Sequence, residues 1–327
     1  MHVVTGGAGF IGSNIAAELE ARGEEVAVVD WLGTDEKWRN IAKRRLADLI
    51  APEQVFDALQ EHRGRVKSVI HMGAISATTE RDADLIADTN FRLSKRLWTW
   101  CAEAGIPFIY ASSAATYGDG EAGFDDHDDP ASLARLRPLN AYGWSKHVFD
   151  RWARHEADRG AAAPPVWAGL KFFNVYGPNE AHKGGMRSVA KQLHEQIREK
   201  GQVRLFASDR PDYADGGQMR DFVWVGDCVD IALWMIQGEA ENGLYNTGSG
   251  QARSFLDLAR AAFAALDLEE KIDFFDMPDQ LKGKYQYFTE AAMEKLARAG
   301  YPGQRTPLET GVSRYLRDFL DCADPYR

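Results

Sequence analysis

Tyr142 and Lys146 are the two residues whose types and spacing most directly suggest chemistry. A separation of four residues places both side chains on one face of a helix, about one turn apart. A free tyrosine, with a pKa of about 10, is a poor base at neutral pH, but a neighbouring ammonium group favours its phenolate form. The pair therefore predicts proton transfer. Because the chain has 11 tyrosines, chance could produce this spacing, so the surrounding sequence has to support the prediction.

A glycine-rich turn near the N-terminus predicts a site for a dinucleotide. It follows a short β-rich run, His2 to Thr5, and precedes a helical pattern from Ile11 to Ala21. The glycines of the turn are Gly6, Gly9 and Gly12. Glycines at this spacing allow a tight turn and the close approach of a pyrophosphate, which the N-terminus of the helix would hold.

The next predicted strand carries the residue that would bind the ribose of such a dinucleotide. Glu25 to Val29 is apolar and β-branched and ends in Asp30, the acid expected about 20 residues beyond the glycine turn. Asp30 favours NAD, whereas Lys37 and Arg39 follow closely and could neutralise the 2′-phosphate of NADP. These residues alone leave the choice between NAD and NADP open.

Apolar strands alternate with helical patterns through the first half of the chain, which predicts an α/β fold with a doubly wound parallel sheet of the Rossmann type. Ligands bind such a sheet at the carboxyl ends of its strands, where Asp48, Leu49 and Ser113 are expected. A serine there could bond to a substrate oxygen or could only satisfy backbone groups. The other predicted elements are strands at 45–47, 66–71, 107–111 and 166–172, helices at 52–62 and 82–104, and the helix that carries Tyr142.

The alternation of strands and helices breaks near residue 173. We expect a dinucleotide-binding domain over residues 1–173 and a smaller mixed α/β substrate-binding domain over residues 174–327. Short strands are predicted at 222–224 and 244–246, and the sequence leaves open whether the part near 222–250 returns to the large sheet. A glycine-rich, acidic stretch at 119–130 indicates a surface loop. Ser254 begins a helix as its N-cap, but the acid three residues later is Asp257 and not the Glu of a full capping box.

Composition narrows the classes of partner. A hydrophobic content of 45% and a charged content of 27% over 327 residues are typical of a globular protein. No run is apolar enough to span a bilayer and the N-terminus lacks a secretory pattern, so we expect a cytoplasmic protein that does not bind membranes. The net charge of −10 argues against a nucleic-acid partner. Cys101, Cys228 and Cys322 are scattered, which indicates reduced thiols and no metal site.

The chain resembles the extended short-chain dehydrogenase/reductase superfamily in the order of its motifs. These are the glycine turn, Asp30, Asn90, Ser113 and the pair formed by Tyr142 and Lys146. Within it, the chain is similar to the ADP-glycero-manno-heptose 6-epimerase family of lipopolysaccharide core biosynthesis, from residue 1 to about residue 318. The segments that carry the closer resemblance are 5–14, 111–118, 172–178, 182–184 and 281–286.

The resemblance implies a tightly held NADP that oxidises carbon 6 of the sugar to a ketone and reduces it again from the other face. It implies an ADP-sugar substrate and a homo-oligomer. The implied catalytic residues are Tyr142, Lys183, Lys146 and Ser113. The motifs and the resemblance together give as cofactor-binding residues Gly6, Gly9, Phe10, Ile11, Gly12, Asp30, Trp31, Lys37, Asp48, Leu49, Met72, Gly73, Ala74, Ile75, Ser76, Asn90, Tyr142, Lys146, Val175 and Lys183. The implied substrate-binding residues are Ser113, Asn174, Gly185, Gln192, Phe206, Arg220 and Tyr285.

Some positions depart from the family pattern. Trp31 replaces the usual polar neighbour of Asp30, and Met72 replaces a usual acid, so the contacts with the adenosine ribose stay open. The loop at 207–219, between two substrate-binding positions, is longer than typical, which leaves the sugar nucleotide open while the chemistry is predicted. A sugar-nucleotide 4-epimerase would use Tyr142 but would not need Lys183. A 4,6-dehydratase would carry an Asp-Glu pair after Thr116, which this chain lacks. A non-catalytic NADP-binding protein commonly loses the tyrosine-lysine pair. His182, next to Lys183, is a third acid/base candidate, but a lone histidine in a loop is more often exposed, and we expect it to be exposed.

Overall fold

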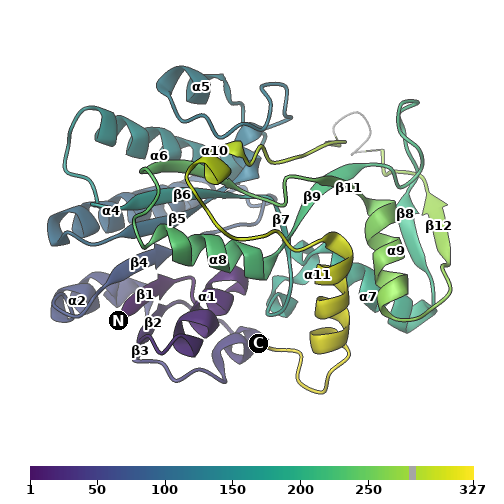
Figure 1. Ribbon diagram of the computed structural model, residues 1–327, viewed down its shortest axis with the longest axis horizontal. Helices are drawn as coiled ribbons and strands as arrows, with labels where there is room; N and C mark the ends of the chain where they lie inside the picture. The colour runs from purple at the N-terminus through teal and green to yellow at the C-terminus, as the bar shows by residue number, and fades with distance from the viewer. Residues whose placement is uncertain (280–284) are drawn as a thin grey trace.

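A parallel sheet of seven strands runs through the larger part of the molecule, in the order β10-β6-β5-β4-β1-β2-β3 (Figure 1). The structure, a computed structural model, describes residues 1–279 and 285–327. Most of the motif at 281–286 therefore lies outside the described residues. Every neighbouring pair in this sheet is parallel, which confirms the doubly wound fold. Its strands are β1 (His2–Thr5), β2 (Val26–Val29), β3 (Asp48–Ile50), β4 (Ser68–His71), β5 (Phe108–Ser113), β6 (Trp167–Phe172) and β10 (Gly243–Thr247).

Helices cover both faces of this sheet. On one face α1 (Phe10–Ala21) lies beside α8 (Val225–Met235), and on the other lie α4 (Leu93–Ala104) and α6 (Ala141–Asp158) (Figure 1). Trp98 of α4 makes edge contacts with aromatic rings of β5, β6 and α6, so these elements pack as one unit. The shorter helices around the sheet are η1 (Glu36–Ile41), η2 (Pro52–Gln54), α2 (Val55–Glu61), η4 (Ala114–Tyr117), α5 (Pro130–Arg135) and α10 (Glu294–Arg298).

The second half of the chain builds a smaller lobe with its own hydrophobic core. In a three-stranded sheet, β9 (Met219–Trp224) lies between β7 (Asn174–Tyr176) and β11 (Ala252–Ser254), and β8 (Val203–Phe206) pairs with β12 (Ile272–Phe275). Its helices are η5 (Ala181–Met186), α7 (Val189–Lys200), α9 (Phe255–Ala265), α11 (Leu308–Tyr315) and η6 (Leu316–Leu320). The domain boundary between residues 173 and 174 stays a prediction, and β10 pairs with β6 in the large sheet.

Some local predictions were wrong. The strand expected at 45–47 begins at Asp48, where β3 pairs with β2 and Ile50 is buried against it. The helix expected at 82–104 is present over residues 83–104, but it contains an unpredicted π-helical segment, η3 (Ala87–Arg92), between α3 (Ala83–Ile86) and α4. The helix at Ser254 does have a complete capping box, because the shorter Asp257 side chain still reaches the Ser254 N–H at 3.1 Å.

The stretch at 119–130, predicted as a surface loop, is partly buried. Its Asp126 carboxylate accepts a hydrogen bond from the Asn246 N–H at 2.8 Å, and burial raises the pKa of Asp126. The Asn246 amide donates to the Phe124 carbonyl and accepts from the Tyr117 hydroxyl. The loop therefore holds β10 in the sheet. In the described ranges, no helix combines the length and the apolar character required to cross a membrane.

Candidate active site

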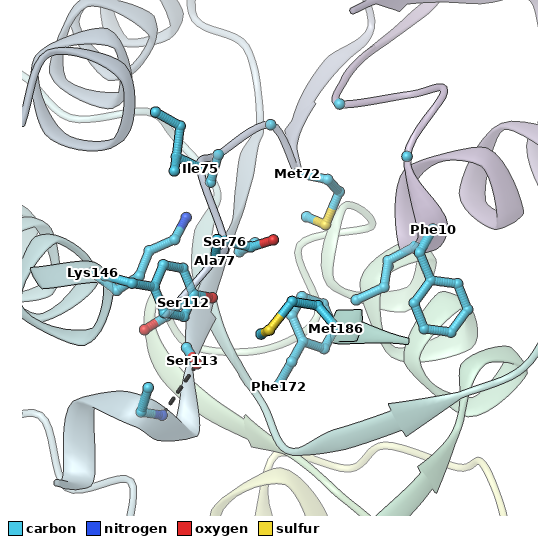
Figure 2. A pocket seen from close by; sticks show the side chains of 18 of the residues that line it. Phe10, Met72, Ile75, Ser76, Ala77, Ser112, Ser113, Lys146, Phe172 and Met186 are labelled. Atoms are coloured by element: carbon cyan, nitrogen blue, oxygen red, sulfur yellow. Dashed lines mark hydrogen bonds between the residues drawn. The ribbon is translucent and has the colours of Figure 1, made fainter. Parts of the chain in front are cut away.

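A cavity of about 810 Å³ lies at the carboxyl ends of the parallel strands, between the large sheet and the smaller lobe. Figure 2 shows Lys146, Ser112, Ser113 and Ile75 on one side of it and Phe10 and Met72 on the other, with Met186 and Phe172 between them. The predicted residues that line the cavity are Gly6, Gly9, Phe10, Ile11, Gly12, Asp30, Trp31, Lys37, Met72, Gly73, Ala74, Ile75, Ser76, Ser113, Tyr142, Lys146, Asn174, Val175, Lys183 and Arg220.

The glycine turn is packed too closely for any other residue. Gly6 has a φ of +62°, and a Cβ placed on it would lie 2.6 Å from the backbone nitrogen of Gly73 at the end of β4. A Cβ on Gly12 would lie 2.1 Å from the Gly6 carbonyl oxygen. Gly9 is the N-cap of α1 and offers no capping side chain, and the first turn of the helix holds no acid. The helix N-terminus therefore faces the cavity with N–H groups suited to a pyrophosphate.

A carboxylate and an ammonium meet where a ribose of the dinucleotide would lie. Asp30 accepts hydrogen bonds from the Ala8 N–H at 3.0 Å and from Lys37 Nζ at 2.6 Å. Lys37 Nζ also donates to the carbonyl of Trp31, whose indole is exposed and bonds to Glu53. The ammonium thus offers a positive charge next to the acid, a combination that can hold a ribose hydroxyl and an anion together.

Tyr142 and Lys146 project from α6 into the cavity beside Ser113. Burial raises the pKa of Tyr142, and this effect is opposed by a hydrogen bond from the Ser113 hydroxyl. Burial lowers the pKa of Lys146 to about 8, and the carboxylate of Asp150 opposes that shift. Ser113 also accepts from the Ala115 N–H, which fixes its hydroxyl at the end of β5 (Figure 2). The three groups form a buried site for proton exchange with a substrate oxygen.

Lys183 enters the cavity from the opposite lobe on η5. Its ammonium lies 5.3 Å from the centroid of the Phe10 ring, and burial lowers its pKa, opposed by the charge of Glu180. His182, expected to be exposed, is half-buried instead: burial first, and then the charge of Lys37, lower its pKa to about 4. Its Nδ1 contacts the Asn40 side-chain nitrogen at 3.1 Å, which ties η5 to η1.

Arg220 supplies a buried cation on the substrate side of the cavity. It is 8% exposed, no carboxylate among the described residues pairs with it, and its guanidinium lies 5.1 Å from the Tyr285 ring centroid. Burial lowers its pKa. Phe206 makes an edge contact with Tyr285. A buried arginine without an acidic partner is suited to a ligand that brings its own negative charge.

Several predicted site residues do not line the cavity. Asn90 is buried behind it, where its amide bonds to both the N–H and the carbonyl of Ile75 and so holds the loop at 72–76 in place. Asp48 faces His62, and Leu49 is exposed, because β3 lies at the edge of the sheet. Gly185, Gln192, Phe206 and Tyr285 are also absent from its lining.

Sequence reasoning missed other lining residues. Pro52 and Val55 close the end of the cavity near Asp30, and Met186 reaches into it from η5. Gln286 lines it as well and donates to the Gly118 carbonyl at 3.1 Å. Met186 follows the predicted Lys183 closely in the chain, a signal that could have marked it, whereas the apolar letters of Pro52 and Val55 are the same as those of core residues.

Comparisons with known proteins agree on the fold and on the family. The family model described as NAD dependent epimerase/dehydratase family matches residues 2–248. The ADP-L-glycero-D-manno-heptose-6-epimerase of Nitratidesulfovibrio vulgaris strain DP4 is 51% identical, with 100% of each chain covered. The protein of the same name from Fusobacterium nucleatum is 46% identical, again over 100% of both chains.

Solved structures of epimerases have the same fold. That of the Helicobacter pylori ADP-L-glycero-D-manno-heptose-6-epimerase has a TM-score of 0.79 at 25% identity, over 98% of this chain and 96% of that one. The Thermus thermophilus UDP-glucose 4-epimerase in complex with NAD has a TM-score of 0.71 at 26% identity, over 96% and 97% of the two chains. Both likenesses extend over the large sheet and the smaller lobe.

Proposed function

The chain belongs to the NAD dependent epimerase/dehydratase family, and from this premise we propose that it inverts carbon 6 of the heptose in ADP-glycero-manno-heptose by transient oxidation to a ketone. The product would serve lipopolysaccharide core biosynthesis. The observation that carries the proposal is that Tyr142 and Lys183, two proton-exchanging groups on different lobes, line one cavity. The bound dinucleotide supplies the oxidation and the return of hydrogen to carbon 6.

Inversion by this route requires two groups that exchange protons. The sugar must present each face of carbon 6 to the cofactor in turn, so its oxygen occupies two positions, and each position needs its own proton acceptor and donor. Tyr142 is fixed on α6, where the Ser113 hydroxyl favours its phenolate form, and Lys146 lines the cavity one turn further along the same helix. Lys183 serves the second position, because its desolvated ammonium gives up a proton more readily than an exposed lysine.

The cofactor is a nicotinamide dinucleotide, as in the rest of the family, and we assign it as NADP. The residues present fit that group: the open helix N-terminus at Gly9 suits the pyrophosphate, Asp30 suits a ribose hydroxyl, and Lys37 adds the charge that a 2′-phosphate requires. NAD has no 2′-phosphate for the Lys37 ammonium to bind. Ile75 and its neighbours in the loop at 72–76 would lie along the cofactor, held there by Asn90.

The substrate is proposed to lie between the two lobes. Arg220 would bind the pyrophosphate of an ADP-sugar bidentately, and Asn174, which also lines the cavity, would contact the sugar. Phe206 and Tyr285 support Arg220 from behind. The other two predicted substrate residues, Gly185 and Gln192, stay predictions. A 4-epimerase remains the alternative, and it would leave Lys183 without a role.

The proposed setting is the cytoplasm, in agreement with three free cysteines. Self-association into a homo-oligomer is also proposed, and light scattering at working concentration tests it. The large hydrophobic side chains exposed on the helical side of the first lobe, Leu85 on α3 and Trp144 on α6, are suited to such a contact.

The direct test incubates the purified protein with each carbon-6 epimer of ADP-glycero-manno-heptose, without added dinucleotide, and follows the sugar by nuclear magnetic resonance. Both reactions should reach the same mixture, because the enzyme returns its own hydrogen. Acid release of the bound nucleotide should give NADP. If neither epimer is converted while UDP-glucose or UDP-galactose is, the protein is a 4-epimerase, and if nothing is converted the proposal fails.

A further inference from the structure

A buried ion pair lies directly behind the proton-exchanging side of the cavity. Lys171 Nζ donates to the Asp150 carboxylate at 2.8 Å, and the two side chains are 1% and 0% exposed. Asp150 accepts two further hydrogen bonds from β5, from the Ser112 hydroxyl at 2.7 Å and from the Tyr110 hydroxyl at 3.0 Å. One carboxylate on α6 thus holds β5 and, through Lys171, β6.

A second branch of this network reaches Ser113. Lys171 Nζ also donates to the Thr116 hydroxyl at 2.8 Å, and that hydroxyl donates to the carbonyl of Ser113 at 2.8 Å. Ser112, bonded to Asp150, is the preceding residue of the same strand. Ser113 is therefore held in place by the hydrogen bond to its carbonyl and by the hydrogen bond between its neighbour Ser112 and Asp150. Phe172, the residue after Lys171, lines the cavity.

Asp150 lies on the same face of α6 as the predicted catalytic pair. Tyr142, Lys146 and Asp150 are each four residues apart, so they follow one another along one stripe of the helix. A fully buried ion pair adds little net stability, because desolvation offsets the attraction between the charges, and a well-packed apolar pair often stabilises a fold equally well. The contacts of this pair instead converge on the residues of the active site.

We propose that Asp150 and Lys171 are positioning residues of the active site, which fix α6, β5 and β6 so that the Ser113 hydroxyl stays against Tyr142. The Asp150 carboxylate has a second role, because its negative charge acts on Tyr142 and Lys146. This inference rests on the proposed function for its activity readout. Neither residue touches the cavity, so both act through the groups that line it.

The electrostatic part follows from the surroundings of the helix. Of the pair, only Asp150 shifts the pKa values of Tyr142 and Lys146, and it raises both. Four further titratable groups near these residues are neutral near pH 7. Burial lowers the pKa of His71 on β4 to about 3 and that of His147 on α6 to about 4, and it raises the pKa values of Tyr110 and Tyr117. Removal of the Asp150 charge should therefore lower the pKa values of both catalytic groups.

The experiment replaces the pair by uncharged side chains of similar size, as the double variant Asp150→Asn/Lys171→Met. Each single variant is made as well, since it leaves one buried charge unpaired and should unfold more readily than the double variant. The matched control removes the ion pair of Glu20 and Arg44, 2.7 Å apart and remote from the cavity, as Glu20→Gln/Arg44→Met. Tyr110→Phe removes one hydrogen bond to Asp150 and keeps its charge.

The double variant should melt closer to wild type than either single variant, yet its kcat should fall by about 10- to 100-fold, the size of effect that a small misplacement of catalytic groups produces, with KM nearly unchanged. Both limbs of its pH–rate profile should move to lower pH, because both pKa values fall. Tyr110→Phe and the control should keep the limbs in place. A profile that keeps the wild-type limbs, or a kcat restored to wild type, would show that the pair is only structural.

Two further measurements keep the inference testable if the double variant does not fold or the substrate differs. Thr116→Val is nearly isosteric and removes the branch that joins Lys171 to the Ser113 carbonyl, while the ion pair of Lys171 with Asp150 stays. The kcat should therefore fall about 10-fold with the limbs in place. Activity within about threefold of wild type would overturn the positioning role. In the double variant, absorbance titration of Tyr142, corrected with the matching Tyr142→Phe protein, needs no substrate. An unchanged midpoint there would overturn the electrostatic role, whatever reaction the enzyme catalyses.

Discussion

Replacement of Lys183 by Met should nearly abolish epimerisation and leave the bound dinucleotide in place. The ammonium of Lys183 is largely removed from water, burial lowers its pKa, and the nearest opposing charge, Glu180, is itself occupied by hydrogen bonds to Ser188 and Tyr315. Methionine keeps most of the length and the apolar character of the side chain and removes the ammonium group, including its cation–π contact with Phe10.

The expected loss follows from the role of Lys183 as one of two acid/base groups. A positioned acid/base contributes roughly 10²–10⁴ to a rate, which is about 3–6 kcal/mol of activation free energy at about 1.4 kcal/mol per tenfold. We expect the upper part of this range, because the other titratable side chains of that lobe described in the cavity lining cannot replace Lys183: His182 is already neutral at pH 7, and an arginine such as Arg220 stays protonated.

The assay compares kcat for interconversion of the two carbon-6 epimers in wild type, Lys183→Met and the control Lys191→Met. Lys191 lies on the next helix, α7, pairs with Glu195 at 3.4 Å and does not line the cavity. Bound NADP is measured on the same samples. Epimerisation by Lys183→Met within about threefold of wild type would refute the second acid/base role, and loss of the cofactor would show that Lys183 mainly holds the dinucleotide.

The remaining predictions concern other parts of the site. Tyr142→Phe should slow the reaction by roughly 10²–10⁴ with NADP still bound, and product formed by the wild type in deuterated water should carry no deuterium on carbon 6. Gly6→Ala should destabilise the fold by about 2–5 kcal/mol in urea unfolding, because the residue would have a φ of +62° and its Cβ would clash with Gly73, whereas Gly64→Ala, which meets nothing within 4 Å, should change little. Lys37→Met should weaken NADP binding by about 10- to 100-fold, equivalent to one charged hydrogen bond, and leave NAD binding nearly unchanged in calorimetry.

The parts of the site that the sequence predicted are those in which a short stretch of chain defines its own geometry. The spacing of Gly6, Gly9 and Gly12 specifies a turn that only glycine can form, and the four-residue spacing of Tyr142 and Lys146 specifies one helix face. Both follow from local backbone geometry. The alternation of strands and helices was predictable for the same reason, since each element carries its own periodicity.

The parts that could not be predicted depend on neighbours far along the chain. Asn90 has the expected residue type, but whether its amide binds a ligand or a loop depends on the position of Ile75. Asp150 reads as a charged residue on a solvated helix face, and only the fold brings Lys171 of β6 against it. The guanidinium of Arg220 packs on the ring of Tyr285, a residue 65 positions later in the sequence.

The place of β10 at the end of the large sheet constrains the order in which the chain can fold during synthesis. Six strands are complete once residue 172 has left the ribosome, but β6 gains its second neighbour only when residues 243–247 follow, after β7, β8 and β9 have been made. Until then β6 is an open edge, with unpaired N–H and carbonyl groups that invite pairing with another nascent chain. The Asp126 carboxylate likewise cannot accept its hydrogen bond from the Asn246 N–H until residue 246 has been made. A fragment that stops at residue 173 would keep this edge permanently and should aggregate.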